Sequence, residues 1–481
     1  MKKYLIKAMV IIMIIVESMA FNSINALAIC DDIKGGTILH AWCWSFKTIK
    51  DNIQEIEDAG YDAIQVSPPQ ECKVNKECCK CKQEGKIGCT CFQENWYYLY
   101  QPTNFKIGNY SLGTRDEFEE MCSAAKQHNI KIIVDVVVNH VSIDLSSVSD
   151  DVKKIPNVFH NQGELSGTNA ADWLDRWKIT QRDMLGLYDL NTGDLGVQKM
   201  IKNYMNDCLK CGAWGFRYDA AKHIELPKEI DGDYGSDFWP NITKNATDNG
   251  AGYQYGEVLQ DSVSRFYEYS KYMDVTASKY GKKIRDAIRG RYLNHGYIMD
   301  YDSEGVKGDK LVTWVESHDN YANAQDCSDT SAWLNDNEIR VGWAIVAGRA
   351  AGVPLFFNRP VGGGGRDNLG RFKLQFPEKT KLGDKGSDLF KDPYIVAINK
   401  FRKAMKDEDE YLRSQNGKLL IIERGNKGMI IVNWSGNSAV SSETRLSDGI
   451  YTDAVSNKEF KVENGRISGN TENDITILTQ K

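Results

Sequence analysis

The chain has 481 residues, room for two or three domains, and 41% of them are hydrophobic, which excludes an intrinsically disordered protein. The formal net charge is −6 and no basic stripe is present, so nucleic acid is not an expected partner. The 11 Trp and 23 Tyr suit a protein that stacks on flat ligands such as sugars, although a large core would use them as well.

The first 28 residues have the pattern of a signal peptide. Three lysines within the first seven residues precede an apolar run at 8–16, which is too short to span a bilayer, and 26–28 offer a small-residue cleavage site. A membrane anchor is the alternative interpretation, whereas Ile29 before Cys30 argues against a lipoprotein. We therefore expect a secreted, extracellular protein with no membrane association after processing.

Strand-like and helix-like segments alternate along most of the chain. The segments expected to form buried strands are 36–42, 62–68, 130–140, 213–219, 252–259, 308–320 and 352–360. Amphipathic helices are predicted at 48–60, 115–129 and 197–212. Repeated strand–helix units imply an α/β fold with a parallel sheet, and so many units in one region favour a (β/α)8 TIM barrel over an open sheet.

Two stretches interrupt this rhythm. Residues 141–194 are long and irregular, which indicates a loop domain inserted after the third strand. Residues 411–481 contain short apolar runs separated by Gly and Asn turns, which predict a C-terminal all-β sandwich domain. The catalytic barrel is therefore expected in two parts, 35–140 and 195–410, with a Cys-rich insert at 71–92.

Polar and charged side chains gather where the predicted strands end. They are His40, Asp135, Asn139, His140, Arg217, Asp219, Lys222, His223, Glu257, Glu316, His318 and Asp319. A single residue of this kind is more often a capping or structural group than a catalyst. Because the active sites of parallel barrels lie at the carboxyl ends of the strands, the whole set predicts a catalytic centre.

Three of these residues are acids suited to glycoside hydrolysis. A retaining glycosidase uses two carboxyl groups about 5–5.5 Å apart, one to attack the sugar carbon and one to protonate the leaving oxygen. Arg217 lies two residues before Asp219 on the same strand, so we expect it to lower the pKa of Asp219. Glu257 has no cation beside it in the sequence, and its place between Asp219 and Asp319 is expected to raise its pKa, as a general acid requires.

Four strand-end motifs resemble the alpha-amylase family of glycoside hydrolases. They are DVVVNH at 135–140, GFRYDAAKH at 215–223, GEVLQD at 256–261 and WVESHDN at 314–320, and LYDLN at 187–191 is similar to a fifth. The resemblance extends from about residue 35 to the C-terminus and is closest to secreted bacterial alpha-amylases of the bacillus type. It implies Asp219 as nucleophile, Glu257 as acid/base and Asp319 as transition-state stabiliser.

The resemblance also implies which residues contact the sugar. They are Tyr97, Tyr100, Gln101, His140, Arg217, Lys222, His223, Asp261 and His318. We expect Tyr97 and Tyr100, in the stretch NWYYLYQP, to stack on sugar rings, with loop packing as the alternative role.

A structural calcium between the barrel and the loop domain is a further implication of the resemblance. Its ligands would be the side-chain oxygens of Asn139 and Asp189 and the carbonyls of Thr180 and His223. Such an all-oxygen set suits a hard cation. Some relatives bind chloride through an Asn before the His–Asp pair and a basic residue on the last strand. Ser317 and Leu355 stand at those places here, so we expect no chloride dependence.

Six of the 12 cysteines lie in the insert, which the family does not require. They are Cys72, Cys78, Cys79, Cys81, Cys89 and Cys91. Export favours a disulfide knot, whereas the close spacing also suits a zinc or other soft-metal cluster. Buried thiols are expected on helices at Cys122, Cys208 and Cys211. No role is assigned to Cys30, Cys43 or Cys327.

These features predict endo-hydrolysis of α-1,4-glucan linkages in starch or glycogen, with maltooligosaccharides as further ligands and retention at the anomeric carbon. We expect a monomer. A relative that acts on small maltodextrins or transfers glycosyl groups remains an alternative, because subsite shape decides whether water or a sugar is the acceptor. An inactive starch-binding protein is disfavoured because all three acids are present. A metal-binding role of the cysteine insert would leave most of the chain unexplained.

Overall fold

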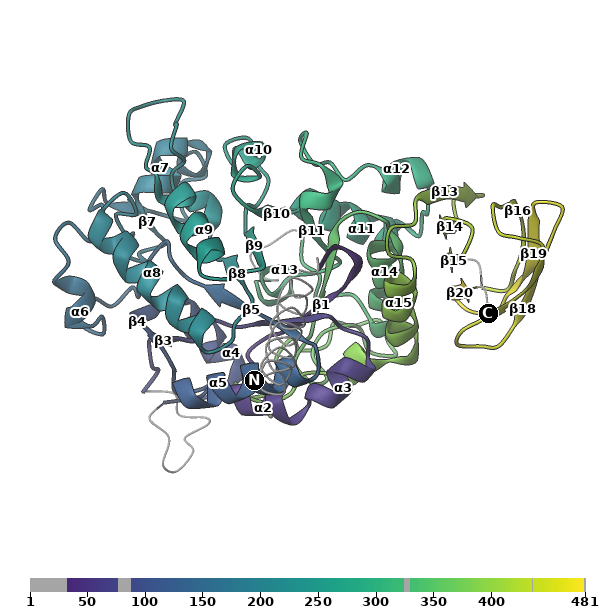
Figure 1. Ribbon diagram of the computed structural model, residues 1–481, viewed down its shortest axis with the longest axis horizontal. Helices are drawn as coiled ribbons and strands as arrows, with labels where there is room; N and C mark the ends of the chain where they lie inside the picture. The colour runs from purple at the N-terminus through teal and green to yellow at the C-terminus, as the bar shows by residue number, and fades with distance from the viewer. Residues whose placement is uncertain (1–32, 77–87, 324–328, 435, 480–481) are drawn as a thin grey trace, which may run out of the picture. The chain divides into compact units, whose positions relative to one another are not determined.

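The computed structural model describes residues 33–76, 88–323, 329–434 and 436–479 (Figure 1). The predicted signal peptide lies outside these residues, and so do five of the cysteines: Cys30, Cys78, Cys79, Cys81 and Cys327. Within the described residues, no helix combines the length and the hydropathy needed to cross a bilayer.

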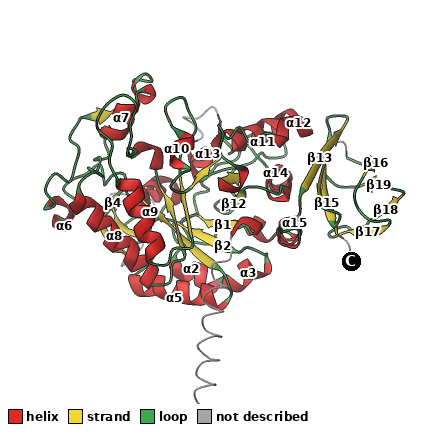
Figure 2. Ribbon diagram, turned by 45° about the horizontal axis from the view of Figure 1, so that its top comes forward, coloured by secondary structure: helices red, strands yellow, loops and turns green. Residues whose placement is uncertain are grey.

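Eight parallel strands close into a barrel, which confirms the predicted (β/α)8 fold. In chain order they are β1 (Ile38–Ala41), β2 (Ala63–Val66), β5 (Lys131–Val136), β8 (Gly215–Tyr218), β9 (Tyr253–Gly256), β10 (Asp274–Thr276), β11 (Leu311–Trp314) and β12 (Val353–Phe357). Each strand pairs with the next in this series, and β12 closes the barrel on β1. Figure 2 shows the strands ringed by helices, which explains why most strand residues are buried and apolar.

Helices connect the barrel strands and cover them. The longer ones are α5 (Arg115–Gln127), α8 (Leu195–Lys210), α9 (Phe238–Asp248), α11 (Ser278–Gly290), α14 (Asp336–Gly348) and α15 (Pro393–Ala404). The shorter ones are α2 (Phe46–Asp51), α3 (Ile53–Asp58), α4 (Phe92–Asn95), α10 (Phe266–Tyr269), α12 (His295–Met299) and α13 (His318–Ala322). Thr114 and Glu117 form a capping box at the start of α5, so the chain enters this helix at a defined residue.

Two elements differ from the sequence prediction. The helix expected at 48–60 is two helices, α2 and α3, which meet at Asn52. The Asn52 side chain donates to the carbonyl of Thr48 at 2.8 Å, a local bond of the kind that competes with helix continuation. Strand β10 is absent from the prediction because its three residues, DVT, offer no apolar run to recognise.

Short elements fill the segment between β5 and α8, the loop domain of the sequence analysis. They are α6 (Asp150–Lys153), β6 (Glu164–Leu165), α7 (Arg176–Gln181) and β7 (Asp183–Met184), and β6 pairs with β7 in parallel. An antiparallel bridge between His140 and Asp189 joins the two ends of the segment. There the N–H of Leu190 donates to the carbonyl of Asn139 at 2.9 Å. The residues after β5 therefore lie beside the LYDLN motif.

The C-terminal domain is all-β, as predicted, and its eight strands form one continuous antiparallel sheet. In sheet order they are β13 (Glu410–Gln415), β14 (Leu419–Arg424), β15 (Gly428–Asn433), β20 (Ile475–Thr479), β17 (Gly449–Asp453), β18 (Glu459–Glu463), β19 (Arg466–Thr471) and β16 (Ser438–Glu443). Leu419 and Ile421 of β14 belong to a core inside the domain, whereas Leu420 and Ile422 belong to the core that includes the barrel. This part of the sheet, which Figure 1 shows beside α14 and α15, is therefore buried on both faces.

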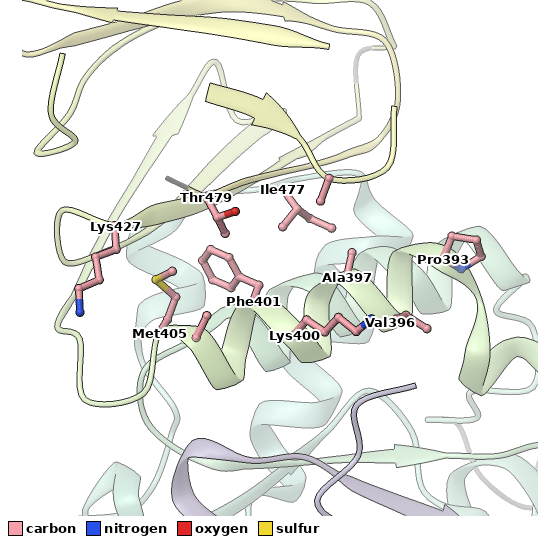
Figure 3. A pocket seen from close by; sticks show the side chains of 11 residues that line it. Pro393, Val396, Ala397, Lys400, Phe401, Met405, Lys427, Ile477 and Thr479 are labelled. Atoms are coloured by element: carbon pink, nitrogen blue, oxygen red, sulfur yellow. The ribbon is translucent and has the colours of Figure 1, made fainter. Parts of the chain in front are cut away.

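An apolar pocket of about 720 Å³ lies between α15 and the C-terminal sheet. Figure 3 shows Phe401 of α15 and its C-cap residue Met405 facing Ile477 and Thr479 of β20 across it. None of its lining residues comes from the carboxyl end of a barrel strand, so this pocket is separate from the predicted catalytic centre.

Candidate active site

A cleft of about 350 Å³ opens at the carboxyl ends of the barrel strands. Most of the predicted site residues line it: Tyr97, Tyr100, Gln101, His140, Asp219, Lys222, His223, Glu257, His318 and Asp319. Arg217 lies buried among the acids, and Asp261 is tied to the cleft through Lys222. Of the four predicted calcium ligands, only His223 lines the cleft.

The Arg217 guanidinium is the centre of the acid cluster. Its Nη1 donates to Asp135 Oδ1 at 2.7 Å and to Asp219 Oδ1 at 2.7 Å. Its Nη2 lies 2.9 Å from Glu257 Oε2. One buried cation therefore holds three carboxyl groups, which come from β5 and from the ends of β8 and β9.

The barrel register explains this convergence. Asp135 and Arg217 are direct partners in the parallel pairing of β5 with β8, so their side chains leave the sheet on the same side. Asp219 follows Arg217 by two residues and points the same way. The chain then turns at Ala220, whose φ of 48° is unusual for a residue other than glycine. This turn aims the Ala220 N–H at Glu257 Oε2, 2.9 Å away.

The third acid enters the cleft at the start of α13. Ser317 caps this helix by accepting a hydrogen bond from the N–H of Asn320 at 3.3 Å, which fixes the direction of the two residues between them. Asp319 is hydrogen-bonded to Glu257. The His318 ring stacks on Tyr100 with centroids 5.0 Å apart. Asp319 is therefore held against the other two acids by a rigid helix start.

The pKa of Asp219 is raised well above its ordinary value, so the predicted lowering is wrong. Burial is the largest cause. Arg217 acts in the expected direction, but its single charge is shared among three carboxyl groups. The charges of Glu257, Asp135 and Asp319 add to the effect of burial, and together they outweigh the arginine.

The pKa of Glu257 is lowered to about 2, again opposite to the prediction. Burial raises this pKa, but Arg217, His318 and the hydrogen bonds from Ala220 and Asp319 outweigh it. The cation that the sequence did not place beside Glu257 comes from the neighbouring strand. Burial and the Glu257 charge raise the pKa of Asp319 to about 8. Asp319 therefore keeps its proton at neutral pH, in its hydrogen bond with Glu257.

A family model described as the alpha-amylase catalytic domain matches residues 45–334. The chain belongs to the alpha-amylase family. The matched residues run from just after β1 to beyond α13, so they contain Arg217 and all four carboxyl groups of the cluster. The family predicted from the strand-end motifs is confirmed.

Two curated bacterial relatives named alpha-amylase, from Butyrivibrio fibrisolvens and Clostridium acetobutylicum, are each 37% identical to this chain, over 95% and 94% of its length. The chain spans about half the length of these relatives, 48% and 55%. The structure of alpha-amylase I from Eisenia fetida has a TM-score of 0.74, with 19% identity over 92% of this chain and 97% of that one. An Anoxybacillus alpha-amylase has a TM-score of 0.68, with 16% identity over 94% of this chain and 99% of that one. The two structures share the fold.

The two tyrosines predicted to stack on sugar differ in this alpha-amylase-family cleft. Tyr97 is 39% exposed at the rim, so its ring is open to a ligand. Tyr100 is 9% exposed, stacks on His318 and donates its hydroxyl to Asp135 Oδ2 at 3.2 Å. Tyr100 therefore also serves as a packed support for the acid cluster.

Other predicted sugar contacts surround the acids. Lys222 Nζ lies 2.8 Å from Asp261 Oδ2, which holds the amine at the cleft. His140 Nε2 lies 3.0 Å from the carbonyl of Tyr100. Gln101 lines the cleft, and its Oε1 is buried and has no hydrogen-bond partner among the described residues.

Seven residues of the cleft wall are not among the predicted ones. They are Trp96, Trp173, Met184, Leu185, Leu187, Ala220 and Leu259. Four of them come from the loop domain, whose irregular sequence gives no strand end from which to place a side chain. The signal for Trp96 and for the cluster role of Asp135 lies inside the motifs NWYYLYQP and DVVVNH.

The four proposed calcium ligands of this alpha-amylase-family chain fall in two pairs. Asn139 and Asp189 lie at the bridge that joins the ends of the loop domain. Thr180 is in the last turn of α7, and its carbonyl accepts a hydrogen bond from Gln181 Nε2 at 2.9 Å. The neighbouring carbonyl of Ile179 accepts from His223 Nδ1 at 2.8 Å, so α7 and His223 are in contact.

The surroundings of Asp189 fit a cation. Its side chain is buried, and burial together with the charges of Glu225 and Asp183 raises its pKa. Its Oδ2 lies 2.6 Å from His160 Nδ1, but burial lowers the pKa of that histidine and keeps it neutral. The described residues contain no group of three or more His, Cys, Asp or Glu that could hold a metal. The fit therefore depends on amide and carbonyl oxygens, the donors that calcium accepts.

The Cys-rich insert begins on β3 (Gln70–Cys72), which pairs with β4 (Pro102–Ile107). Cys72 has a free thiol, so the prediction that it belongs to a six-cysteine disulfide knot is wrong. Its side chain is buried, which raises the pKa of the thiol to about 12. Cys89 and Cys91 are disulfide-bonded, which favours the disulfide interpretation for these two. The other free and buried thiols described are those of Cys43, Cys122, Cys208 and Cys211.

Proposed function

We propose that this alpha-amylase-family protein hydrolyses internal α-1,4 bonds of starch and glycogen, and that maltooligosaccharides bind in the same cleft. The observation that carries the proposal is the convergence of Asp219, Glu257 and Asp319 on one cleft around Arg217. The name of the 37% identical relatives supports it. A solved alpha-amylase I variant from Eisenia fetida in complex with maltohexaose supports an oligosaccharide ligand.

In the proposed reaction, Asp219 attacks the anomeric carbon and forms a covalent glycosyl ester, while Glu257 protonates the leaving glycosidic oxygen. Glu257 then removes a proton from the water that cleaves the ester. Two inversions at the same carbon give net retention. Asp319 faces the positive charge that develops on the sugar ring and stabilises it.

The acid cluster also accounts for the proton that the leaving group needs. In the free protein this proton resides on Asp319, in a hydrogen bond with Glu257. We propose that it moves along this bond to Glu257 when the sugar displaces water. The transfer makes Glu257 the protonated general acid. It also leaves Asp319 ionised when positive charge develops on the sugar ring. The same developing charge favours the ionised form of Asp219.

The experiment incubates the purified protein with soluble starch and calcium, and follows iodine colour, reducing ends and the anomeric configuration of the first products by proton NMR. Fast loss of colour with few new ends and α-configured products supports the proposal. Slow loss of colour with many new ends would indicate end-wise action on small maltodextrins. Products longer than the substrate would indicate glycosyl transfer.

The substitution Asp219→Asn tests the nucleophile. We expect kcat to fall by roughly 10³-fold or more, because a neutral amide cannot form the ester. Starch binding should persist, because Arg217 and the cleft walls remain. Asp388→Asn at the exposed surface is the matched control and should keep wild-type turnover. A kcat of the Asp219 variant near the wild-type value would contradict the assignment.

We also propose a structural calcium bound by Asn139, Thr180, Asp189 and His223. Bound there, the ion would neutralise Asp189 and tie the loop domain to the barrel. Chelation is expected to lower the melting temperature, because a ligand that binds only the native state stabilises it. Asp189→Asn should weaken calcium retention in elemental analysis. An unchanged melting temperature in chelator, with no calcium found in the untreated protein, would overturn the site.

Export, a monomeric state and chloride independence complete the proposal. Export is supported by the first 28 residues alone, and N-terminal sequencing of protein recovered from the medium would locate the cleavage. Ser317 acts as the cap of α13, and Leu355 is buried in β12, so neither supplies a basic anion ligand. Activity measured after chloride is exchanged for acetate tests chloride independence. Size-exclusion chromatography tests the monomeric state.

A further inference from the structure

Three free thiols lie together on α5 and α8, away from the cleft. Cys122 is on α5, Cys208 is on α8, and Cys211 is the C-cap of α8. Their residues are buried, with 2%, 0% and 4% exposed. None of them lines the cleft, so the proposed function does not account for a cluster of three sulfur atoms.

Two contacts hold α5 and α8 together at this cluster. Arg115 of α5 forms a bidentate ion pair with Asp207 of α8, with N–O distances of 2.9 and 2.7 Å. Gly212 lies directly against Cys122, because a Cβ built on Gly212 would be 3.1 Å from the Cys122 Cβ. Gly212 also has a φ of +104°, which favours glycine. Cys211 directly precedes Gly212 in the chain, so its Cα lies about 3.8 Å from the Gly212 Cα. Cys211 is therefore close to Cys122.

The surroundings distinguish the three thiols. Cys208 is fully buried beside Tyr204, one turn earlier on the same helix, which makes its sulfur the least accessible of the three. Cys211 is the most exposed of the three and lies beside Arg115. Burial raises the pKa of Cys211 to about 11, and the Arg115 charge limits the rise. Cys211 is therefore the thiol best placed to react first, and Cys122 is its neighbour on the other helix.

We propose that Cys122 and Cys211 form a disulfide that joins α5 to α8 when the protein meets a small-molecule disulfide such as oxidised glutathione. The Cys211 thiolate attacks one sulfur of that disulfide, which forms a mixed disulfide and releases one small thiolate. The Cys122 thiolate then attacks the Cys211 sulfur and releases the second. The protein loses two electrons and two protons, and the small disulfide is reduced to two thiols.

The bond would close a long loop of the catalytic domain. Cys122 precedes β5 and Cys211 precedes β8, so the loop contains the whole segment between these two strands, including the loop domain. A disulfide across a long loop restricts the unfolded chain and thereby favours the native state. Cys89 and Cys91 are already disulfide-bonded, so two other cysteines of the same chain are oxidised.

The test holds the native full-length protein at pH 8.5 with oxidised glutathione for several days, because burial leaves little thiolate and the exchange is slow. Peptide mapping without reduction should then show Cys122 and Cys211 in one linked pair of peptides. The melting temperature of the oxidised protein should be several degrees higher than that of the untreated protein.

Two single variants keep the test decisive. Cys122→Ser should give no linked peptide and no gain in melting temperature under the same treatment. Cys208→Ser is the matched control, since it removes a thiol of the same cluster, and it should keep both. The proposal is overturned if the wild-type protein gives no Cys122–Cys211 peptide, or if Cys208 rather than Cys211 is found linked to Cys122.

Discussion

Arg217 has one positive charge, and three carboxyl groups share it. Asp135, Asp219 and Glu257 all contact the guanidinium within 3 Å, and their side chains are only 0%, 10% and 14% exposed, so a single cation cannot hold all three ionised. Burial prevails at Asp135, whose pKa rises to about 6, and at Asp219. The planar guanidinium makes this sharing possible, because a lysine presents only a point charge.

The pH dependence of activity should reflect the proton that Asp319 holds in its hydrogen bond with Glu257. Burial raises the pKa of Asp319 to about 8, and the proposed reaction needs that proton on Glu257. We therefore expect kcat/KM to fall as the pH rises through about 8. The measurement is the initial rate on a short maltooligosaccharide between pH 5 and 10 at constant ionic strength. A decline that begins well below pH 7 would disagree with this assignment.

Asp135→Asn is the companion variant for this profile. The Asp135 charge raises the pKa of both Asp219 and Asp319, so its removal should move the alkaline decline to lower pH. A merely structural role of Asp135 would lower the rate and leave the position of the decline unchanged.

Strand β14 shows how one element can serve two cores. Its residues alternate between a core inside the C-terminal domain and the core that includes the barrel, and all six are buried. Ile422 faces α14, where a Cβ built on Gly348 would lie 3.3 Å from the Ile422 side chain. One face of β14 therefore stabilises the C-terminal domain itself, and the other face packs this domain against the barrel.

Ile422→Ala is expected to lower the free energy of unfolding by about 2–5 kcal/mol, because it opens a cavity between the sheet and α14. Ile450→Ala in β17 is the control: this isoleucine is 58% exposed, and its loss should change the free energy by less than about 0.5 kcal/mol. Thermal or urea unfolding of both variants checks the difference. Equal effects of the two substitutions would mean that the C-terminal sheet is not docked as described.

At the scale of the whole molecule, the Asp319 carboxyl, whose side chain is 35% exposed at the cleft, links catalysis to stability. Above about pH 7.5 the five histidines whose pKa burial lowers are almost entirely neutral in the native and the unfolded states, because even their ordinary pKa is 6.5. Asp319 keeps its proton to about pH 8 in the native state but loses it near 3.8 when unfolded. From about pH 7.5 through 8 the native state therefore binds more protons, and stability falls as the pH rises.

We expect the melting temperature to decline from about pH 7.5 to 8.5, measured by calorimetry in buffers of matched ionic strength. Asp319→Asn should flatten this decline, because the neutral amide has no proton to lose. A melting temperature that increases over the same range would show that the cluster does not retain the proton.

The sequence was sufficient for the barrel and for the residues at its strand ends, because parallel strands must bring their carboxyl ends to one face. It was not sufficient for β10, which is too short to have a pattern, or for Leu185, which lies in an irregular segment. The predicted directions of the Asp219 and Glu257 pKa shifts were wrong because these shifts depend on tertiary contacts. Arg217 is near Asp219 in the sequence, but only the folded barrel shows that Glu257 shares it.

The two-sided burial of the C-terminal sheet limits how the chain can be shortened. A truncated protein ending at Ala404 would expose the apolar surface of α14 and α15 that now contacts β15 and β20. Such a surface promotes aggregation, so the barrel is not expected to be a usable fragment by itself. Fusion partners are better attached beyond Thr479, where they would leave this interface intact.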